Sequence, residues 1–142
     1  MSRKTAREQA FKLIYELAVE GEPNSFSLEL MTENCDDADT LFINKLYDGV
    51  REKFDFLKSV VERYSKGFSF ERIFKIDCAL IMMASYEILY IDDIPTAASV
   101  NEAVELAKKY STDKSAAFIN GVLASVAADK EELLNEESVQ DN

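Results

Sequence analysis

The chain has 142 residues, of which 47% are hydrophobic, and it contains only four glycines and two prolines. This composition excludes a disordered chain and favours a single domain of long helices over a sheet with many turns. The formal net charge of −11 argues weakly against nucleic acid as a partner, although the distribution of charge matters more than its sum.

Apolar residues at helical spacing predict the first three helices. Residues 3–19 combine an apolar face with a basic stripe, in which Arg3 and Arg7 lead to Phe11 at intervals of four. A short helix is expected over residues 25–33, with Ser25 as its cap. Residues 38–64 are predicted to form one long helix, and Gly49 within it indicates a close helix crossing because glycine disfavours helix interiors.

The second half of the chain predicts three more helices. Residues 76–90 are apolar nearly all round, which is typical of the central helix of a bundle. Residues 96–110 follow Pro95, and the last helix, over about 115–128, begins after a cap at Thr112 or Asp113. Gly121 in this helix is interpreted as a second close crossing. The fold class is therefore all-α.

The two ends of the chain differ in charge. Residues 1–12 contain four basic residues and one acidic residue, whereas residues 129–142 contain six acidic residues and one basic residue. The apolar periodicity also stops at residue 129. We therefore expect a helical domain over 1–128 and a disordered acidic tail over 129–142.

The sequence favours binding over catalysis. It has no histidine, no glycine-rich phosphate loop, and no cysteine spacing typical of a metal site or a disulfide framework. We therefore expect no enzyme activity, no metal and no cofactor. Cys35 and Cys78 suit a reducing cytoplasm. The longest apolar run, residues 79–85, is too short to span a membrane.

Two local features point to a ligand. Arginines four residues apart share a helix face and can follow a phosphate backbone, while a neighbouring aromatic ring can stack on an unpaired base. The alternative for the first helix is an ordinary solvated face with Phe11 in the core. Lys114 and Phe118 stand near the start of the last helix, where an anion or a base can bind.

Several sequence blocks, taken together, carry a family resemblance. Asn-Glu-Ala-Val-Glu-Leu-Ala-Lys at 101–108 is followed by Phe-Ile-Asn-Gly-Val-Leu at 118–123, and Tyr86-Glu87 lies upstream of both. The chain opens with Arg3, Ala-Arg-Glu at 6–8 and Leu-Ile-Tyr at 13–15. In this order and spacing the chain resembles the NusB family of bacterial transcription antitermination factors over residues 3–127.

The resemblance implies a bundle of about seven helices in two sub-bundles that share one core. It also implies binding to the single-stranded boxA element of nascent RNA, together with NusE, a ribosomal small-subunit protein. The pair would join RNA polymerase and the other Nus factors, chiefly during ribosomal RNA synthesis, with no chemical step and no membrane.

The resemblance also assigns residues by position. The RNA-binding residues would be Arg3, Lys4, Arg7, Tyr64, Lys114, Ser115 and Phe118. The surface for NusE would draw on Tyr15, Glu71 and Asp77. Tyr64 and Glu71 match only after a shift of one residue.

Two departures leave an alternative open. Met82 occupies a position where the family usually has arginine, so any ion pair of that arginine is missing. The basic N-terminus is also sparse beside the net charge of −11. The alternative is a NusB-like adaptor between proteins, or a homodimer, with weak RNA binding.

Overall fold

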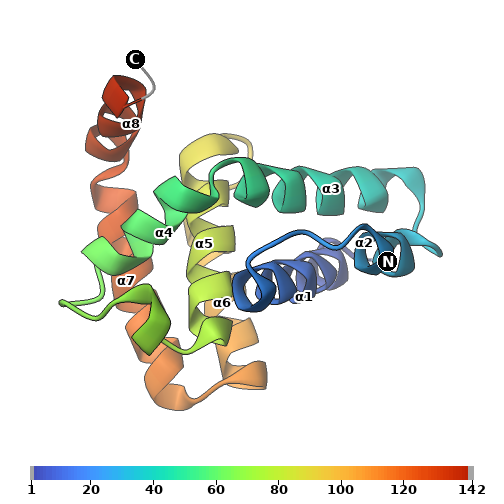
Figure 1. Ribbon diagram of the computed structural model, residues 1–142, viewed down its shortest axis with the longest axis horizontal. Coiled ribbons are helices and arrows are strands. Elements are labelled where there is room, and N and C mark those ends of the chain that lie inside the picture. Colours follow the sequence, from blue (N-terminus) through green and yellow to red (C-terminus); the bar gives the residue numbers. More distant parts are fainter. Residues whose placement is uncertain (1, 141–142) are drawn as a thin grey trace.

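The computed structural model describes residues 2–140, which form eight α-helices and one 3₁₀ turn (Figure 1). The α-helices are α1 (Arg3–Glu20), α2 (Ser25–Thr32), α3 (Asp37–Glu52), α4 (Phe54–Arg63), α5 (Lys75–Tyr90), α6 (Thr96–Tyr110), α7 (Asp113–Ala128) and α8 (Lys130–Gln140), and the 3₁₀ turn η1 spans Phe70–Arg72. The predicted all-α class is confirmed, with eight helices in place of about seven. None of the helices within 2–140 is long and apolar enough to cross a membrane.

Helix α5 joins the two halves of the bundle. It packs against α1 and α3 on one side and against α4, α6 and α7 on the other (Figure 1). Nearly all of its side chains are buried, as expected for a helix that is apolar all round. Met82, at the position where arginine was expected from the family, lies fully within this core.

The predicted long helix over 38–64 is wrong, because the chain bends at Lys53. This residue leaves helical geometry with φ −103° and ψ 19°, so α3 ends at Glu52 and α4 begins at Phe54. The bend directs Val50 and Leu57 into one core from two helices of different direction. Lys53 still donates its backbone N–H to Gly49, at 3.0 Å, so little hydrogen bonding is lost.

The glycine predictions have opposite outcomes. A Cβ atom on Gly49 would overlap the ring of Tyr86 on α5, which confirms the predicted close crossing. Gly121, by contrast, is exposed and faces open space, so the second predicted crossing is wrong.

Two helix starts were also predicted. Thr112 caps α7 as predicted, through a hydroxyl that accepts from the Ser115 N–H at 3.0 Å. The cap of α2 is Asn24, not Ser25, because the Asn24 side chain accepts from two backbone N–H groups.

The expectation of a disordered tail is wrong for residues 130–140, which form α8; residues 141 and 142 lie outside the described residues. Leu133 of α8 is 1% exposed and Leu134 is partly buried, so the helix packs apolar side chains against the core. Glu132 and Glu136 pair with Arg63 of α4, and Glu137 pairs with Lys53 at the bend. Contacts between residues far apart in the sequence therefore order a segment that has no apolar periodicity of its own.

Candidate nucleic-acid interface

The start of α1 presents two basic side chains to solvent. Arg3 and Lys4 are both exposed, and the Arg3 guanidinium lies 3.9 Å from the centre of the Phe42 ring on α3. This contact holds the guanidinium over an aromatic face while leaving its edges free to donate hydrogen bonds. Both residues are therefore placed where phosphate groups can reach them.

Arg7 lies inside the protein and not on the predicted basic surface. Its Nη2 and Nε atoms donate to Glu87 Oε1 at 2.8 and 3.1 Å, and the two side chains are 6% and 0% exposed. Ser99 of α6 donates to the same carboxylate at 3.2 Å. The ion pair and Ser99 thus connect α1, α5 and α6. Glu87 neutralises the positive charge of Arg7 that was predicted to bind RNA phosphates. The alternative in which Phe11 belongs to the core is confirmed, since Phe11 is 3% exposed.

Asp77 and Ser115 are buried together beneath the loop between α6 and α7. Ser115 donates to Asp77 Oδ2 at 2.8 Å, and Ser111 donates to Oδ1 at 3.1 Å. Burial raises the pKa of the Asp77 carboxyl, while the two serine hydroxyls oppose that shift. Neither side chain reaches the surface, which corrects the assignment of Asp77 to a partner and of Ser115 to RNA. Their role is to hold the loop.

Lys114 and Phe118 follow this loop and share a face of α7. Lys114 is exposed and Phe118 is half-buried against the core. The face continues through Gly121 and Ser125, because positions three and four residues apart are neighbours on a helix. Neither of these two residues carries a bulky side chain, and the Ser125 hydroxyl donates back to the Gly121 carbonyl at 3.3 Å. The face is therefore smooth beyond Phe118.

Tyr64 stands at the far end of the same face. Its hydroxyl donates to Asp129, the residue that follows α7, at 2.6 Å. Asp129 lies eleven positions after Phe118, so the two backbone positions are roughly 16 Å apart along the helix axis. Burial and the bond to Asp129 raise the pKa of Tyr64 to about 12. We call Lys114, Phe118, Gly121, Ser125 and Tyr64 the α7 track.

The other two residues predicted to meet a protein partner, Tyr15 and Glu71, are exposed. Tyr15 is 38% exposed on α1, and Val19, one turn later, is also exposed. Glu71 is exposed on η1 and pairs with Lys58 at 3.5 Å. Phe74, just before α5, is 65% exposed. Three of these exposed side chains are apolar and one is acidic, and Phe74 is a residue that the sequence reasoning missed.

Arg63 is the other residue that sequence reasoning missed. It lies next to Tyr64, with its guanidinium 5.5 Å from the centre of the Tyr64 ring. Its signal in the sequence is only the adjacency of a cation and an aromatic residue at the end of an amphipathic helix.

Comparison with known proteins agrees with the fold. The NusB family model matches residues 4–128. The transcription antitermination protein NusB of Ruminiclostridium cellulolyticum is 42% identical over 129 residues, covering 89% of each chain, and that of Clostridium novyi is 40% identical over 131 residues, covering 89% of this chain and 98% of its own.

Solved structures share the architecture. NusB of T. maritima superposes with a TM-score of 0.82 at 24% identity, over 95% of this chain and 98% of its own. A NusB in a crystal structure of antitermination factors NusB and NusE with dsRNA has a TM-score of 0.79 at 22% identity, over 89% and 96% of the two chains. From the match over residues 4–128 and relatives above 30% identity, the chain belongs to the NusB family.

Proposed function

We propose that this protein is a transcription antitermination factor that binds boxA RNA together with NusE and acts on RNA polymerase, chiefly in ribosomal RNA synthesis. Its relatives at 42% and 40% identity are transcription antitermination proteins. A protein of the same fold has been crystallised with NusE and dsRNA. Binding alone accounts for this role, and no chemical step is part of it.

The observation that carries the RNA-binding proposal is the α7 track. It has a cation at one end, in Lys114, and an aromatic side chain at either end, in Phe118 and Tyr64. Single-stranded RNA is bound by this combination, since cations hold the phosphates and aromatic rings stack on bases. Gly121 leaves open space between the rings, so a strand can approach the helix closely.

Arg3 and Lys4 add a second basic point at the start of α1. Each exposed cation that neutralises a phosphate makes binding depend on salt. Arg7 and Ser115 are left out of the proposed surface because their polar atoms are buried and bonded within the protein. The remaining RNA-binding residues are Arg3, Lys4, Tyr64, Lys114 and Phe118.

NusE is proposed to dock on the surface around Tyr15, Glu71 and Phe74. Large exposed aromatic side chains are enriched at protein interfaces. Glu71 supplies a carboxylate for a basic side chain of the partner, after exchange of its exposed pair with Lys58. Asp77 takes no direct part, because it is 4% exposed.

The test is a gel-shift titration of labelled boxA RNA, with and without NusE, at two salt concentrations. We expect NusE to raise the affinity and salt to lower it. Phe118→Ala should weaken binding by about 1–3 kcal/mol, which is the usual loss when one stacked base loses its aromatic partner. Lys114→Ala should reduce the salt dependence.

A matched control is Lys108→Ala, because Lys108 is also an exposed lysine and pairs with its helix neighbour Glu105, at 3.7 Å. It should leave RNA affinity within about twofold of wild type, as expected for an exposed charge away from the site. Equal affinity for boxA and a scrambled RNA of the same length, with NusE present, would contradict the proposal.

A second candidate function is a protein adaptor or homodimer with weak RNA binding. The net charge of −11 favours it, as do the exposed side chains of Phe26 and Leu30 on α2 and Leu41 on α3. Sedimentation over a range of concentrations separates the homodimer from the first proposal. A monomer at every concentration would exclude the homodimer.

A further inference from the structure

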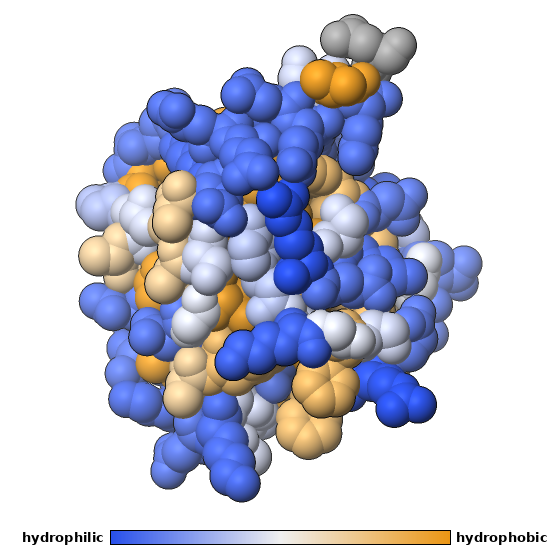
Figure 2. All heavy atoms as spheres, turned by 90° about the vertical axis from the view of Figure 1, so that its left-hand side faces the viewer, coloured by the Kyte–Doolittle hydropathy of each residue, from blue (hydrophilic) through white to orange (hydrophobic). Residues whose placement is uncertain are grey.

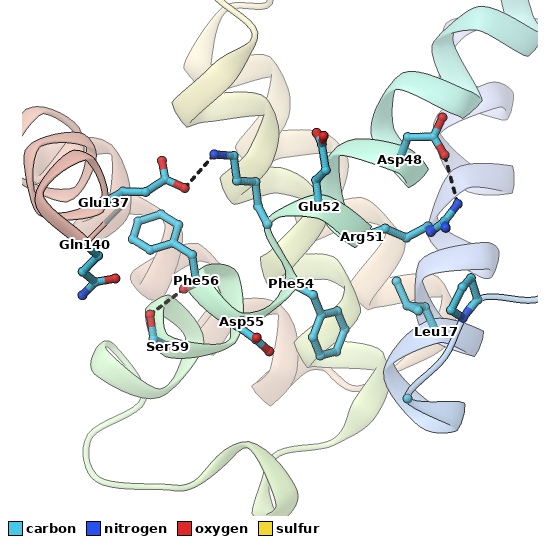
Figure 3. Close-up of a pocket in the computed structure, with 13 residues that line it drawn as sticks. Leu17, Asp48, Arg51, Glu52, Phe54, Asp55, Phe56, Ser59, Glu137 and Gln140 are labelled. Carbon is cyan, nitrogen blue, oxygen red and sulfur yellow. Dashed lines mark hydrogen bonds and ion pairs between the residues drawn. The ribbon is translucent and has the colours of Figure 1, made fainter. Parts of the chain in front are cut away.

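Helix α8 lies outside the residues 4–128 that match the family, yet its carboxylates bond one specific part of the domain. Arg63 donates to Glu132 at 3.1 Å and to Glu136 at 2.5 Å. Lys53 pairs with Glu137 at 3.0 Å, as the dashed line in Figure 3 marks. Lys53 and Arg63 flank α4, so α8 pairs with the cations at both ends of that helix, and Glu137 also accepts from the Tyr90 hydroxyl of α5.

Arg63 and Tyr64 have the chemistry of a nucleotide-binding pair. The guanidinium lies against the tyrosine ring, and such a pair offers one group for a phosphate and one face for a base. In this structure carboxylates occupy both polar ends: Glu132 and Glu136 on Arg63, and Asp129 on Tyr64. A carboxylate and a phosphate accept the same charge-assisted hydrogen bonds from arginine.

The ion pairs between α8 and Arg63 are exposed, and Leu134 is partly buried against the core beside Leu133. Only Leu133 and Glu137 of its side chains are buried. A groove of about 1200 Å³ runs beside the end of α8 and the α3–α4 bend, and Phe54, Phe56, Glu137 and Gln140 are among the residues that line it (Figure 3). The acids paired with Arg63 are 57% and 44% exposed, so each ion pair contributes only about 0–1 kcal/mol.

The surface next to the Tyr64 end of the α7 track carries several acidic residues. Figure 2 views the molecule from the side of α4, α7 and α8, and hydrophilic side chains dominate the upper part of this face. Glu131 and Glu132 belong to the first turn of α8, and Asp129 precedes it. RNA that follows the track from Phe118 towards Tyr64 therefore meets negative charge where it reaches the second ring.

We infer that Arg63 and Tyr64 form a further binding site for single-stranded RNA, and that α8 covers this site with carboxylates in the places of RNA phosphates. RNA gains the site by displacing the side chains of Glu132 and Glu136 from Arg63. The inference rests on the proposed RNA-binding function and extends it to Arg63. Coverage by α8 also makes the site selective in a protein of net charge −11. Only RNAs that displace the α8 carboxylates from Arg63 gain the site.

The test uses the full chain with the double substitution Glu132→Gln/Glu136→Gln, which removes the two charges and keeps the helix. Binding of labelled boxA RNA and of a scrambled RNA is measured by fluorescence anisotropy in the presence of NusE. The control is Glu29→Gln/Glu33→Gln, which removes the same net charge from two exposed acids at α2, away from α8 and the α7 track. Circular dichroism confirms that each variant is folded.

We expect Glu132→Gln/Glu136→Gln to bind boxA RNA about 3–10-fold more tightly than wild type, with a steeper salt dependence because Arg63 gains a phosphate. The control should gain less than about twofold, since exposed charges away from the site are screened by salt. Adding Arg63→Ala to the first variant should remove its gain.

Two outcomes overturn the inference: an affinity equal to wild type, or an equal gain in both double variants, which would reflect net charge alone. Failure of the proposed function gives a different result. In that case wild type and all variants bind boxA and scrambled RNA equally, whatever the effect of the two glutamates.

Discussion

Arg7 of α1 and Glu87 of α5 form a buried ion pair in which the guanidinium donates to both carboxylate oxygens, at 2.8 to 3.2 Å. The partners are 80 residues apart in the sequence. A buried charge without its partner is costly, because the desolvation penalty is then no longer offset. The pair therefore serves the fold, and Arg7 has little charge left to offer a ligand.

We predict that Arg7→Ala lowers the free energy of unfolding by about 3–5 kcal/mol, the usual cost of leaving one buried charge unpaired. Arg3→Ala is the matched control on the same helix and should cost less than about 1 kcal/mol, because Arg3 is exposed. Urea unfolding followed by circular dichroism measures both. Equal small effects of the two substitutions would contradict a structural role for Arg7.

Gly49 and Gly121 should respond in opposite directions to alanine. Gly49→Ala should destabilise by about 1–3 kcal/mol, since the new methyl group overlaps the Tyr86 ring. Gly121→Ala should stabilise by about 0.5–1 kcal/mol, because the position is helical and open. Thermal unfolding gives both signs.

Gly121→Ala also tests the α7 track, since a methyl group there would obstruct a strand that passes close to the helix. We expect boxA RNA to bind this more stable variant more weakly than wild type. Unchanged affinity would show that RNA does not approach Gly121.

The helices were predictable because their apolar residues recur at helical spacing, and α5 was predictable as the central helix because nearly all its faces are apolar. The bend at Lys53 was not predictable. Leu46, Val50, Leu57 and Val61 keep one helical register across it, and neither glycine nor proline marks the break. Tertiary packing, with α3 against α1 and α4 against α5, sets the bend.

Exposure was predictable for only some of the proposed site residues. Lys114, Arg3 and Tyr15 are exposed, as the sequence led us to expect, whereas Phe118 is half-buried. Arg7 and Asp77 have surface-type side chains, and only partners far away in the chain, Glu87 and Ser115, explain their burial. The order of α8 likewise depends on Arg63, which precedes its partners by 69 and 73 residues. Local sequence carries no signal for such pairs.

Asp77 should make stability depend on pH. Burial raises the pKa of its carboxyl in the folded protein above the ordinary value of 3.8. The folded state therefore holds this proton more tightly than the unfolded state. It loses stability as the pH rises from about 4 through the raised pKa, and the loss is constant at higher pH.

Asp77→Asn removes this dependence, since an amide does not ionise and can still bond the hydroxyls of Ser111 and Ser115. We expect wild type to lose stability relative to Asp77→Asn as the pH rises from about 3 to 7. Urea unfolding of both proteins at a series of pH values measures the difference. A constant difference would show that Asp77 has the same pKa in both states.

Tyr64 should contribute to RNA binding through its ring and not through its hydroxyl. The hydroxyl is bonded to Asp129, and its pKa of about 12 keeps it protonated throughout the neutral range. Tyr64→Ala should therefore lose about 1–3 kcal/mol of RNA binding, the usual contribution of one stacked base. Tyr64→Phe keeps the ring and should bind boxA RNA within about threefold of wild type. The hydroxyl group that it removes should contribute little to the free energy of RNA binding, because a neutral hydroxyl only exchanges one hydrogen-bond partner for another. Anisotropy titrations of both variants with NusE present give the comparison.

If Tyr64→Phe binds boxA RNA as weakly as Tyr64→Ala, the hydroxyl group makes the contact with RNA. The prediction that a base stacks on Tyr64 at this end of the α7 track would then be wrong.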